Sequence, residues 1–598
     1  MDPWAARMWA ALILAWAMCV RSTDIAYRFV QITDIHMEPF YNPDRGHAKG
    51  SVCRRPEAFN KSQCVPFKIE PEALMYPFGR LNCDGPHALI RSLFSHIRRE
   101  VEEKAEGMPV FGIFTGDLPS HQLSCQRNQA HTMEFVIAHM AAKLKPVLRR
   151  IYPAMGNNDY FPNYNISLEP NNPWQEFIAS KYARHGLLIG PELETFRRGG
   201  YYSTRPHQGL RLLVVNSVAW SVKMLDWNHT AKKSVVMHPE DDWETYRGPN
   251  APLPEADVSG WKWDTDVADK TVMVPCSMRP RDPYGQLAWL RQELTGARSA
   301  GERVIIAGHV PPGNKVGDNN FCLQHVHELE EITREYQDLI EVQLYGDHSN
   351  DEFRMVWSDG PNAHAVSSVL VSAGVTPRKH CNPSWRLFEV CKHHHVHDFT
   401  QFYLPLTRTN LKWETNPEWI QLHLHGEDEN LAWRFWKKQY SFREQYGVGL
   451  APSDLEGLWR KMQTSPQLTE TYLRNMFSQM VGVEDYFDYF CDMRYLEAED
   501  NARCMQSGRL LPGDRGIWEN RSWSGGPRFS FAAEEAEGAF GSAMPGLLKL
   551  RPEALAALLA LAAALGAAAA TLASRLVLSW QRVQSCDDDP AWRFLSAS

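Results

Sequence analysis

The most regular feature between Arg28 and about Val390 is an alternation of short apolar runs with polar loops. The runs are rich in β-branched or aromatic side chains, which is typical of buried strands. They read RFVQI, VFGIF, RIYPAM, LRLLVV, RVIIAG, VQLY and SSVLV. Between several of them lie amphipathic stretches that predict helices, such as HALIRSLFSHIRREVEEKA and YGQLAWLRQELTGARSAG. This alternation predicts a layered α/β (α+β) domain whose loops after the strands carry the chemistry.

The pattern changes at several points along the chain. We assign residues 24–410 to the α/β domain, with a Trp- and Asp-rich surface insertion or lid at residues 221–280. Residues 411–510 are aromatic and helical in pattern, and they predict a C-terminal subdomain packed on the α/β domain. Residues 511–553 are rich in Gly, Ser and Pro and predict a stalk.

The two ends of the chain carry apolar segments. Arg7 precedes a run of thirteen residues, Met8 to Val20, which is shorter than the roughly 20 residues of a spanning helix. We therefore interpret residues 1–23 as a signal peptide, with an uncleaved anchor as the alternative. Residues 554–574 form a 21-residue stretch without a charge. This stretch predicts one transmembrane helix, although its alanine richness leaves a partner in a helical hairpin as the alternative.

These ends predict a single-pass type I membrane protein of the secretory pathway. Its body would lie in the lumen of a lysosome or vacuole, or outside the cell, and residues 575–598 would form a cytosolic tail. The net charge of −8 over 598 residues shows no basic footprint for nucleic acid.

Cysteine usage agrees with that location. Of twelve cysteines, Cys19 and Cys586 lie at the ends, which leaves ten in the body. In an oxidising compartment this even number would pair, and the spacing of Cys53, Cys64 and Cys83 indicates a local disulfide-bearing insert. N-x-S/T sequons, which are typical of a glycoprotein, occur at Asn60, Asn165, Asn228 and Asn520.

Polar motifs with metal-ligand side chains follow five of the apolar runs. A lone Asp-x-His is more often a helix cap or a surface pair, but five such motifs, each directly after an apolar run, indicate a metal centre at the strand ends. The motifs are TDIH (Asp34, His36), TGDLPSH (Asp117, His121), GNND (Asn157, Asn158), GH (His309) and YGDHS (Asp347, His348, Ser349).

This set resembles the calcineurin-like metallophosphoesterases, and in particular their acid sphingomyelinase-like branch. The likeness covers roughly residues 28–510 apart from the 221–280 insertion, and it includes NCDGPHALIRSLF, YPAMGNNDYFPNY and VTPRKHCNPSWRLFEV. It implies a β-sandwich flanked by helices, with a helical C-terminal subdomain.

The resemblance also implies a ligand set and a reaction. Asp34, His36 and Asp117 would bind one divalent metal ion, and Asp117, Asn157 and His309 would bind a second. Two such ions activate water for in-line attack on phosphorus and neutralise the phosphoryl oxygens. Mixed Asp, His and Asn ligation favours zinc, with manganese or iron as alternatives. The expected partner is a phosphorylated substrate: a phosphodiester, nucleotide, polyphosphate or phospholipid.

Three positions depart from the family pattern. Asp347 and Ser349 stand where the family has two metal-binding imidazoles. Aspartate is a competent oxygen ligand, whereas serine is a poor neutral one, so one metal would be under-coordinated. His348 would substitute if the turn slipped by one residue. The run HHHVH (residues 393–397) would be a further source of imidazoles, with an exposed strand segment as the alternative.

The third departure is Asn158, where the sphingomyelinase branch has a histidine that assists catalysis. Proton donation is worth about 10²- to 10⁴-fold in rate, and an alkoxide leaving group needs it more than a phosphate does. The Asn-Asn-Asp variant is similar to that of vacuolar endopolyphosphatases, and His121 remains as an acid or phosphate-binding group. We therefore predict a dimetal phosphoesterase acting on phosphodiester or phosphoanhydride bonds. The alternative is a weakened or inactive member that binds a phosphorylated ligand or a lipid surface.

Overall fold

The computed structural model of the chain describes residues 25–43, 53–55, 58, 64–67, 76–105, 107–166, 168, 172–226, 276–315, 318–379, 381–415, 432–478 and 487–507. The predicted signal peptide, most of the 221–280 insertion, the stalk, the predicted transmembrane helix and the tail lie outside the described residues. Among the helices of the described ranges, none combines the length and the apolar content needed to cross a bilayer.

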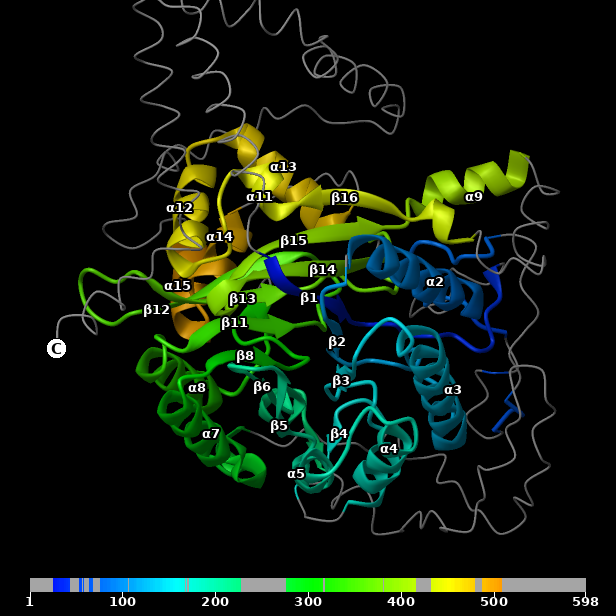
Figure 1. Ribbon diagram of the computed structural model, residues 1–598, viewed down its shortest axis with the longest axis horizontal. Helices are drawn as coiled ribbons and strands as arrows, with labels where there is room; N and C mark the ends of the chain where they lie inside the picture. The colour runs from blue at the N-terminus through cyan, green and yellow to red at the C-terminus, as the bar shows by residue number, and fades with distance from the viewer. Residues whose placement is uncertain are drawn as a thin grey trace, which may run out of the picture. The chain divides into compact units, whose positions relative to one another are not determined.

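The apolar runs form two six-stranded sheets, shown in Figure 1. The first has the strand order β16-β15-β14-β1-β2-β3, and the second has the order β12-β13-β11-β8-β6-β5. In the first sheet β1, β2 and β3 are parallel, and β14 to β16 pair antiparallel. In the second sheet β6, β8, β11 and β13 are parallel, and antiparallel strands lie at both edges. All seven predicted strands are confirmed.

The strand bounds are β1 Ile25–Ile32, β2 Val110–Phe114, β3 Ile151–Pro153, β5 Tyr202–His207, β6 Leu210–Val214, β8 Arg303–Ala307, β11 Ile340–Tyr345, β12 Glu352–Trp357, β13 Ala365–Val371, β14 Ser384–Cys391, β15 Val396–Tyr403 and β16 Lys437–Ser441. Two short pairs join β4 Asn165–Ile166 to β7 Leu225–Asp226 and β9 Asn314–Lys315 to β10 Asp318–Asn319. The sheets share one apolar core, and Gln31 of β1 donates a hydrogen bond to the carbonyl of Tyr345 of β11 at 3.1 Å.

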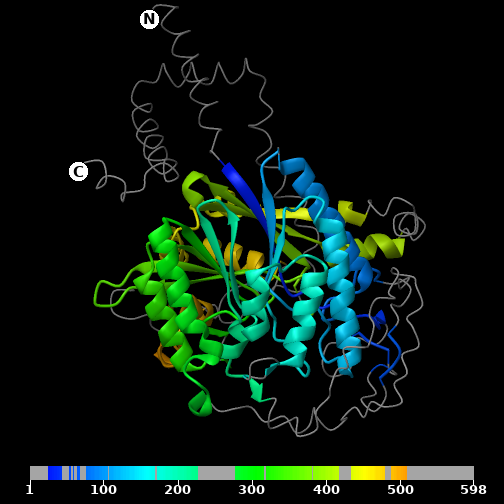
Figure 2. The ribbon, with the colours of Figure 1, turned by 60° about the horizontal axis from the view of Figure 1, so that its bottom comes forward.

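Helices flank the sheets on more than one side. Figure 2 shows α2, α3 and α4 (blue to cyan) on one side and α7 and α8 (green) on the other. The helices of the α/β part are α2 His87–Lys104, α3 Gln126–Leu144, α4 Pro173–Arg184, α5 Pro191–Gly199, α7 Gln286–Ala300, α8 Leu323–Glu335 and α9 Leu406–Thr415. Helices α2 and α7 coincide closely with the two amphipathic stretches named above.

The segment after α9 packs on the sheets through both helices and a strand. Its helices are α11 Phe442–Tyr446, α12 Pro452–Met462, α13 Pro466–Phe477, α14 Phe487–Arg494 and α15 Ala498–Ser507. Helices α12 and α14 contact β13 and β12. Strand β16, in a segment predicted to be helical, pairs with β15 at the edge of the first sheet. Its exposed lysines, Lys437 and Lys438, are typical of an edge strand, but five residues are too few to reveal a period-2 pattern.

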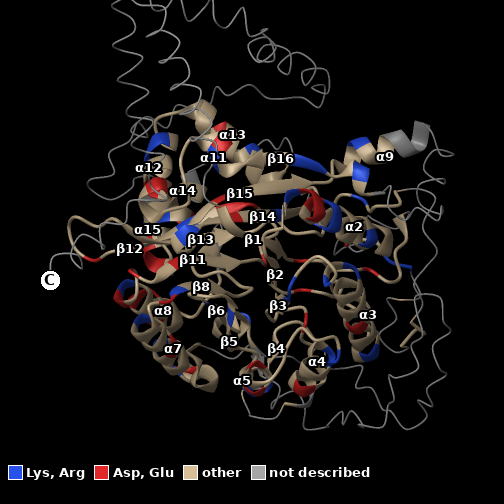
Figure 3. Ribbon diagram, viewed as in Figure 1, with Lys and Arg blue, Asp and Glu red and all other residues tan. Residues whose placement is uncertain are grey.

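Acidic and basic residues both occur along the outer helices, as the coloured ribbon of Figure 3 shows for α7, α8 and α12. Several form exposed pairs one helical turn apart, such as Arg98 with Glu102 and Arg474 with Glu470. Each pair contributes only about 0.3–0.5 kcal/mol, so these helices are held mainly by their buried faces.

Disulfides bear out part of the cysteine prediction. Cys53–Cys83 and Cys64–Cys125 confirm a disulfide-bearing insert near the N-terminal end. Two more bonds are Cys276–Cys322 and Cys491–Cys504, and Cys391 is disulfide-bonded as well. The expectation that all ten body cysteines pair is wrong for Cys381, whose buried thiol forms no disulfide and donates a hydrogen bond to Asn350 Oδ1 at 3.2 Å.

One sequon lies inside the fold. Asn165 is 3 % exposed, and its side-chain amide donates a hydrogen bond to the carbonyl of Phe161 at 3.1 Å. A glycan on Asn165 would have no room in this fold. The other three sequons lie outside the described residues.

Candidate metal centre

Five loops at the carboxyl ends of β1, β2, β3, β8 and β11 meet between the two sheets. The loops are joined by backbone hydrogen bonds, from Asp34 N–H to the Gly116 carbonyl at 3.0 Å and from Gly346 N–H to the His309 carbonyl at 2.8 Å. Because parallel strands deliver their carboxyl ends to one edge, motifs far apart in sequence become neighbours here. Gly156 permits a close approach, since a Cβ there would lie 2.1 Å from an oxygen of Asp117.

The backbone at this edge is unusual. Five of the predicted site residues have left-handed backbone angles, with φ between 43° and 68°: Asp34, His36, Asp117, Asp347 and Ser349. Non-glycine residues rarely adopt this conformation, and it persists where the surrounding structure enforces it, often at functional sites. The fold therefore aims these side chains at some conformational cost.

Hydrogen bonds fix the tautomers of two buried imidazoles. His36 Nδ1 lies 3.0 Å from the Pro119 carbonyl, and His309 Nδ1 lies 2.6 Å from the Thr115 carbonyl. A carbonyl only accepts, so each Nδ1 carries the proton and each Nε2 presents a lone pair in the neutral ring. An Nδ1–H bonded to a carbonyl is the usual arrangement of a histidine that binds metal through Nε2.

Both Nε2 atoms point at one carboxylate. Asp117 Oδ2 lies 3.3 Å from His36 Nε2 and 3.2 Å from His309 Nε2, and Asp34 Oδ1 lies 3.6 Å from His36 Nε2. All four side chains are buried. Asp117 thus occupies the central position expected of a bridging ligand.

The charges of this cluster depend on one another. Burial would lower the pKa of His309, but the neighbouring carboxylates of Asp117, Asp34 and Asp347 together outweigh burial and raise it to about 10. Burial would also lower the pKa of His36, but the carboxylates of Asp117 and Asp34 together outweigh burial and raise it to about 10. Burial would raise the pKa of Asp117, but the two histidines hold it well below its usual range. The carboxylates therefore favour positive charge between themselves and the imidazoles.

The GNND motif adds two amides. Asn157 Oδ1 lies 2.8 Å from His309 Nε2, so this oxygen faces the same point as the imidazole. The adjacent Asn158 donates from its side-chain amide to Asp117 Oδ2 at 2.8 Å and from its backbone N–H to Asp117 Oδ1 at 2.7 Å. Asn158 thus contacts the central carboxylate.

The YGDHS turn directs two of its side chains, Asp347 and Ser349, toward the cluster and a third, His348, away from it. Asp347 Oδ1 lies 3.7 Å from His309 Nε2, and the Asp347 N–H donates to Asp34 Oδ2 at 3.1 Å. Ser349 Oγ donates to Asp34 Oδ1 at 3.4 Å. The turn therefore places both side chains that differ from the family pattern, Asp347 and Ser349, beside the cluster.

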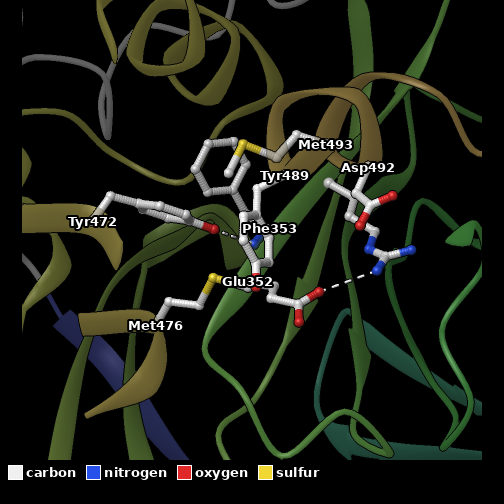
Figure 4. Close-up of a pocket in the computed structure, with 8 residues that line it drawn as sticks. Glu352, Phe353, Tyr472, Met476, Tyr489, Asp492 and Met493 are labelled. Carbon is white, nitrogen blue, oxygen red and sulfur yellow. Dashed lines mark hydrogen bonds and ion pairs between the residues drawn. The ribbon is translucent and has the colours of Figure 1, made fainter. Parts of the chain in front are cut away.

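His348 does not join the cluster. Its Nδ1 lies 3.1 Å from Glu352 Oε2, and its Nε2 accepts from the amide of Asn320 at 3.0 Å. Figure 4 shows Glu352 paired with a guanidinium, that of Arg354 at 3.1 Å, beside a small cavity lined by apolar side chains such as Phe353. Because both ring nitrogens of His348 already have partners, the suggested slip of the turn is not what the structure adopts.

His121 lies beside the cluster on a carboxylate that the sequence analysis did not single out. Its ring stacks on that of His36 with centroids 3.9 Å apart, and its Nδ1 lies 3.0 Å from Asp84 Oδ1. Asp84 is fully buried and also accepts from the hydroxyls of Ser120 and Thr376. Burial lowers the pKa of His121 to about 4, although the charge of Asp84 opposes this.

Asp84 belongs to the quoted stretch NCDGPHALIRSLF, but no apolar run precedes it. A search for ligand motifs directly after apolar runs therefore does not find Asp84. Only its position in a stretch that resembles the family could have indicated it.

The HHHVH run lies at the other end of the strands. His394 Nδ1 is 3.0 Å from the hydroxyl of Tyr27, seven residues before Asp34 and therefore about 20 Å away along the strand. His397 contacts the guanidinium of Arg443. The structure does not bring this run to the cluster.

The donor set fits divalent metal. Two groups of His and carboxylate atoms in the described part of the chain converge within metal-binding range, Asp34 with Asp117 and His309, and His36 with Asp84 and His121. The carboxylate oxygens lie 3.2 to 3.6 Å from the imidazole Nε2 atoms, and a positive charge between them, either a proton on Nε2 or a metal ion, makes this contact favourable. Asp117 lies centrally enough to serve two ions.

Several known proteins are similar to this chain. Residues 27–347 match the sequence profile of the calcineurin-like phosphoesterase family. The chain is 26% identical over 452 residues to the cyclic GMP-AMP phosphodiesterase SMPDL3A of Rattus norvegicus, with 73% of this chain and 81% of that protein covered. It is 24% identical over 508 residues to the acid sphingomyelinase-like phosphodiesterase 3b of Homo sapiens, with 81% and 91% covered. A dimetal phosphatase structure from Danio rerio aligns at 15% identity and a TM-score of 0.33, with 63% of this chain and 96% of that chain covered.

Proposed function

The chain belongs to the calcineurin-like phosphoesterase family and is a hydrolase acting on phosphoester bonds, and we propose that it cleaves phosphodiester or phosphoanhydride bonds at the centre around Asp117. One observation carries the proposal. Two buried imidazoles, His36 and His309, each donate Nδ1–H to a backbone carbonyl and direct Nε2 at the same oxygen of Asp117.

The fold family implies two divalent metal ions. Asp34, His36 and Asp117 would hold one, and Asp117, Asn157 and His309 would hold the other, with Asp347 as a further oxygen ligand. The mixture of imidazole nitrogen and carboxylate oxygen supports zinc, with manganese or iron as alternatives. When bound, the ions would activate water and neutralise the phosphoryl oxygens.

The remaining side chains orient the reacting groups. Asp84 holds the Nδ1–H of His121, which fixes the ring beside His36. His121 would then act on the leaving group or bind a phosphoryl oxygen. Asn158 orients Asp117 by donating two hydrogen bonds to it. An amide is too weak an acid to transfer a proton, so His121 is the remaining candidate acid among the motif residues.

The names of relatives support a phosphodiester substrate, since one is a cyclic GMP-AMP phosphodiesterase and another an acid sphingomyelinase-like phosphodiesterase. The neutral Asn158 supports a leaving group that departs without a strong proton donor, such as a phosphate. We therefore propose that the chain accepts both bond types.

We also propose that the body lies in the secretory pathway, between a signal peptide at residues 1–23 and a membrane-spanning helix at residues 554–574. Disulfides are typical of such a compartment, and four join described cysteines. Protease added to intact microsomes should remove only the tail beyond about Arg575. Digestion of the whole body would contradict this orientation.

Metal content and hydrolysis test the main proposal together. The purified chain should hold close to two metal ions, hydrolyse a chromogenic phosphodiester, ATP or polyphosphate, lose this activity with chelator and regain it with zinc. A chain that binds no metal and hydrolyses none of these substrates, or sphingomyelin, at acid or neutral pH would instead be a binding module.

A further inference from the structure

A loop after β13 places two adjacent basic residues, Arg378 and Lys379, at the edge of the metal centre. Its backbone is joined to both ligand-bearing loops, through Gly374 N–H to the Ser349 carbonyl at 3.2 Å and Thr376 N–H to the Asp34 carbonyl at 2.8 Å. At Gly374 a Cβ would lie 2.8 Å from the Cβ of Asp34. The loop therefore packs directly against the ligands, and Arg378 and Lys379 follow within five residues.

Arg378 is tied to the pair of Asp84 and His121. Its backbone N–H donates to Thr376 Oγ1 at 3.3 Å, and the same hydroxyl donates to Asp84 Oδ1 at 3.0 Å. Its charge also reaches that pair. Burial would raise the pKa of Asp84, but it is lowered below its usual range, chiefly by His121 and more weakly by Arg378. The Arg378 side chain is half-buried.

Lys379 lies against the turn that departs from the family pattern. Its Nζ donates to the backbone carbonyl of Asp347 at 2.6 Å, and the side chain is exposed to solvent. The centre itself is rich in negative charge from Asp34, Asp117, Asp347 and the neighbouring Asp84. Two cations at its edge therefore offset a field that would otherwise repel a polyanion.

We propose that Arg378 and Lys379 bind the non-reacting phosphates of a substrate with consecutive phosphoanhydride bonds, such as a nucleoside triphosphate or inorganic polyphosphate. This inference rests on the proposed function. In the reaction, the oxygen of water bonds to phosphorus and the water gives up one proton to the solvent, while the bridging phosphorus–oxygen bond breaks and the leaving phosphate keeps the electron pair. A cation that stabilises this charge partly replaces the proton donor that Asn158 cannot supply.

Steady-state kinetics of the purified full-length chain with Zn²⁺ would test the assignment. The substrates are tripolyphosphate, ATP and bis(p-nitrophenyl) phosphate, which lacks further phosphates. The variants are Arg378→Gln and Lys379→Gln, because an amide at 379 can still donate to the Asp347 carbonyl. Lys379→Arg is the charge-conserving rescue, and Lys437→Met on the edge strand β16 is the matched control for loss of one exposed positive charge.

We expect Arg378→Gln to raise KM for tripolyphosphate about tenfold more than KM for the diester, as loss of a charge-assisted hydrogen bond implies. Exposed Lys379 should contribute about threefold. Lys379→Arg should restore the ratio, and Lys437→Met should leave it unchanged. If ATP and tripolyphosphate are affected alike, the contacts are to phosphates. An effect on tripolyphosphate alone would restrict the assignment to inorganic chains.

Pyrophosphate binding, measured by calorimetry on the Zn²⁺-loaded chain, gives a readout independent of turnover and should weaken in the same order. Equal losses on anhydride and diester, with unchanged pyrophosphate binding, would overturn the inference and give the loop only a structural role. Absence of hydrolysis of every substrate by the unmodified chain would instead overturn the proposed function. Pyrophosphate binding that is indifferent to Arg378 in such a chain would overturn both.

Discussion

The two sheets contribute to the metal centre in different ways. Loops of the first sheet carry Asp34, His36, Asp117 and Asn157, and all four match the ligands that the family resemblance implies. Loops of the second sheet carry His309 and the turn with Asp347 and Ser349, in which both turn positions depart from the family pattern. This turn nevertheless has left-handed backbone angles at both positions, and the backbone N–H of Asp347 donates a hydrogen bond to the carboxylate of Asp34.

The contrast separates two properties, the path of the backbone and the identity of the ligand side chains, which a comparison of sequences does not distinguish. The path of the backbone at the second sheet is held by contacts of the main chain, so the side chains there can change without moving the turn. The first sheet has less freedom, because Asp117 contacts both imidazoles and also accepts two hydrogen bonds from Asn158. Substitutions should therefore be more damaging on the first-sheet side.

The largest effect is expected at Asp117. Asp117→Ala should remove both metal ions and lower turnover by at least about 10³-fold, equivalent to about 4 kcal/mol of transition-state stabilisation. Metal analysis and turnover on the same preparation check this. Asp359→Ala, which removes a carboxylate that is 82% exposed, is the control and should change neither. A fully metallated, active Asp117→Ala protein would rule out the bridging role.

Asp84→Asn comes next. It should lower turnover by about 10²-fold, because His121 loses the carboxylate that fixes its tautomer, while the chain keeps its metal. Glu102→Gln on the exposed face of α2 is the matched control. The double variant with His121→Ala should be no slower than His121→Ala alone, since both changes act through one group. Additive losses would mean that Asp84 acts independently of His121.

Restoring the second sheet should have a smaller effect, in the opposite direction. Asp347→His with Ser349→His should slow zinc removal by chelator about tenfold, because imidazole binds zinc better than a hydroxyl does. Adding Asn158→His should raise diester hydrolysis relative to polyphosphate hydrolysis. Unchanged zinc release and an unchanged substrate ratio would show that the two positions do not lie at the metal.

The smallest effect on the site is expected at His348. His348→Ala should leave the metal stoichiometry unchanged but lower the free energy of unfolding by about 1–3 kcal/mol, because Glu352 and Asn320 lose a buried partner. Chemical denaturation beside metal analysis distinguishes the two outcomes. Loss of one metal ion without loss of stability would restore His348 as a ligand.

Much of the site follows from one rule of sheet construction. Motifs directly after five apolar runs were expected to form a metal centre at the strand ends, and the structure places those of β1, β2, β3, β8 and β11 together, because parallel strands end at one edge. Asp84 could not be predicted in this way, because it is positioned by an irregular, disulfide-bonded segment and not by the end of a strand. The direction of the His348 side chain could not be predicted either, because the orientation of a side chain in a turn depends on the backbone angles of its neighbours.

The same distinction holds for the fold. Helix α2 was identifiable because its apolar positions recur at helical spacing, and β11 because it is a short, largely buried apolar run. Strand β16 has five residues, and its place in the sheet is decided by pairing with β15 rather than by its own composition. The basic edge at Lys379 depends on a contact between a lysine and a carbonyl 32 positions away, which no local pattern encodes.

The left-handed backbone at five site residues also limits which sequences the family can explore at these positions. Asparagine, aspartate and histidine enter that conformation several-fold more readily than other non-glycine residues, whereas β-branched side chains fit it poorly. The exchange of imidazole for aspartate at 347 stays within this small group, and serine at 349 is at least small and unbranched at Cβ. Conformation thus restricts the available residues first, and metal chemistry selects among those that remain. A chain that loses a ligand by mutation would most easily acquire another small polar side chain at the same position, which keeps the way back to a full metal centre short.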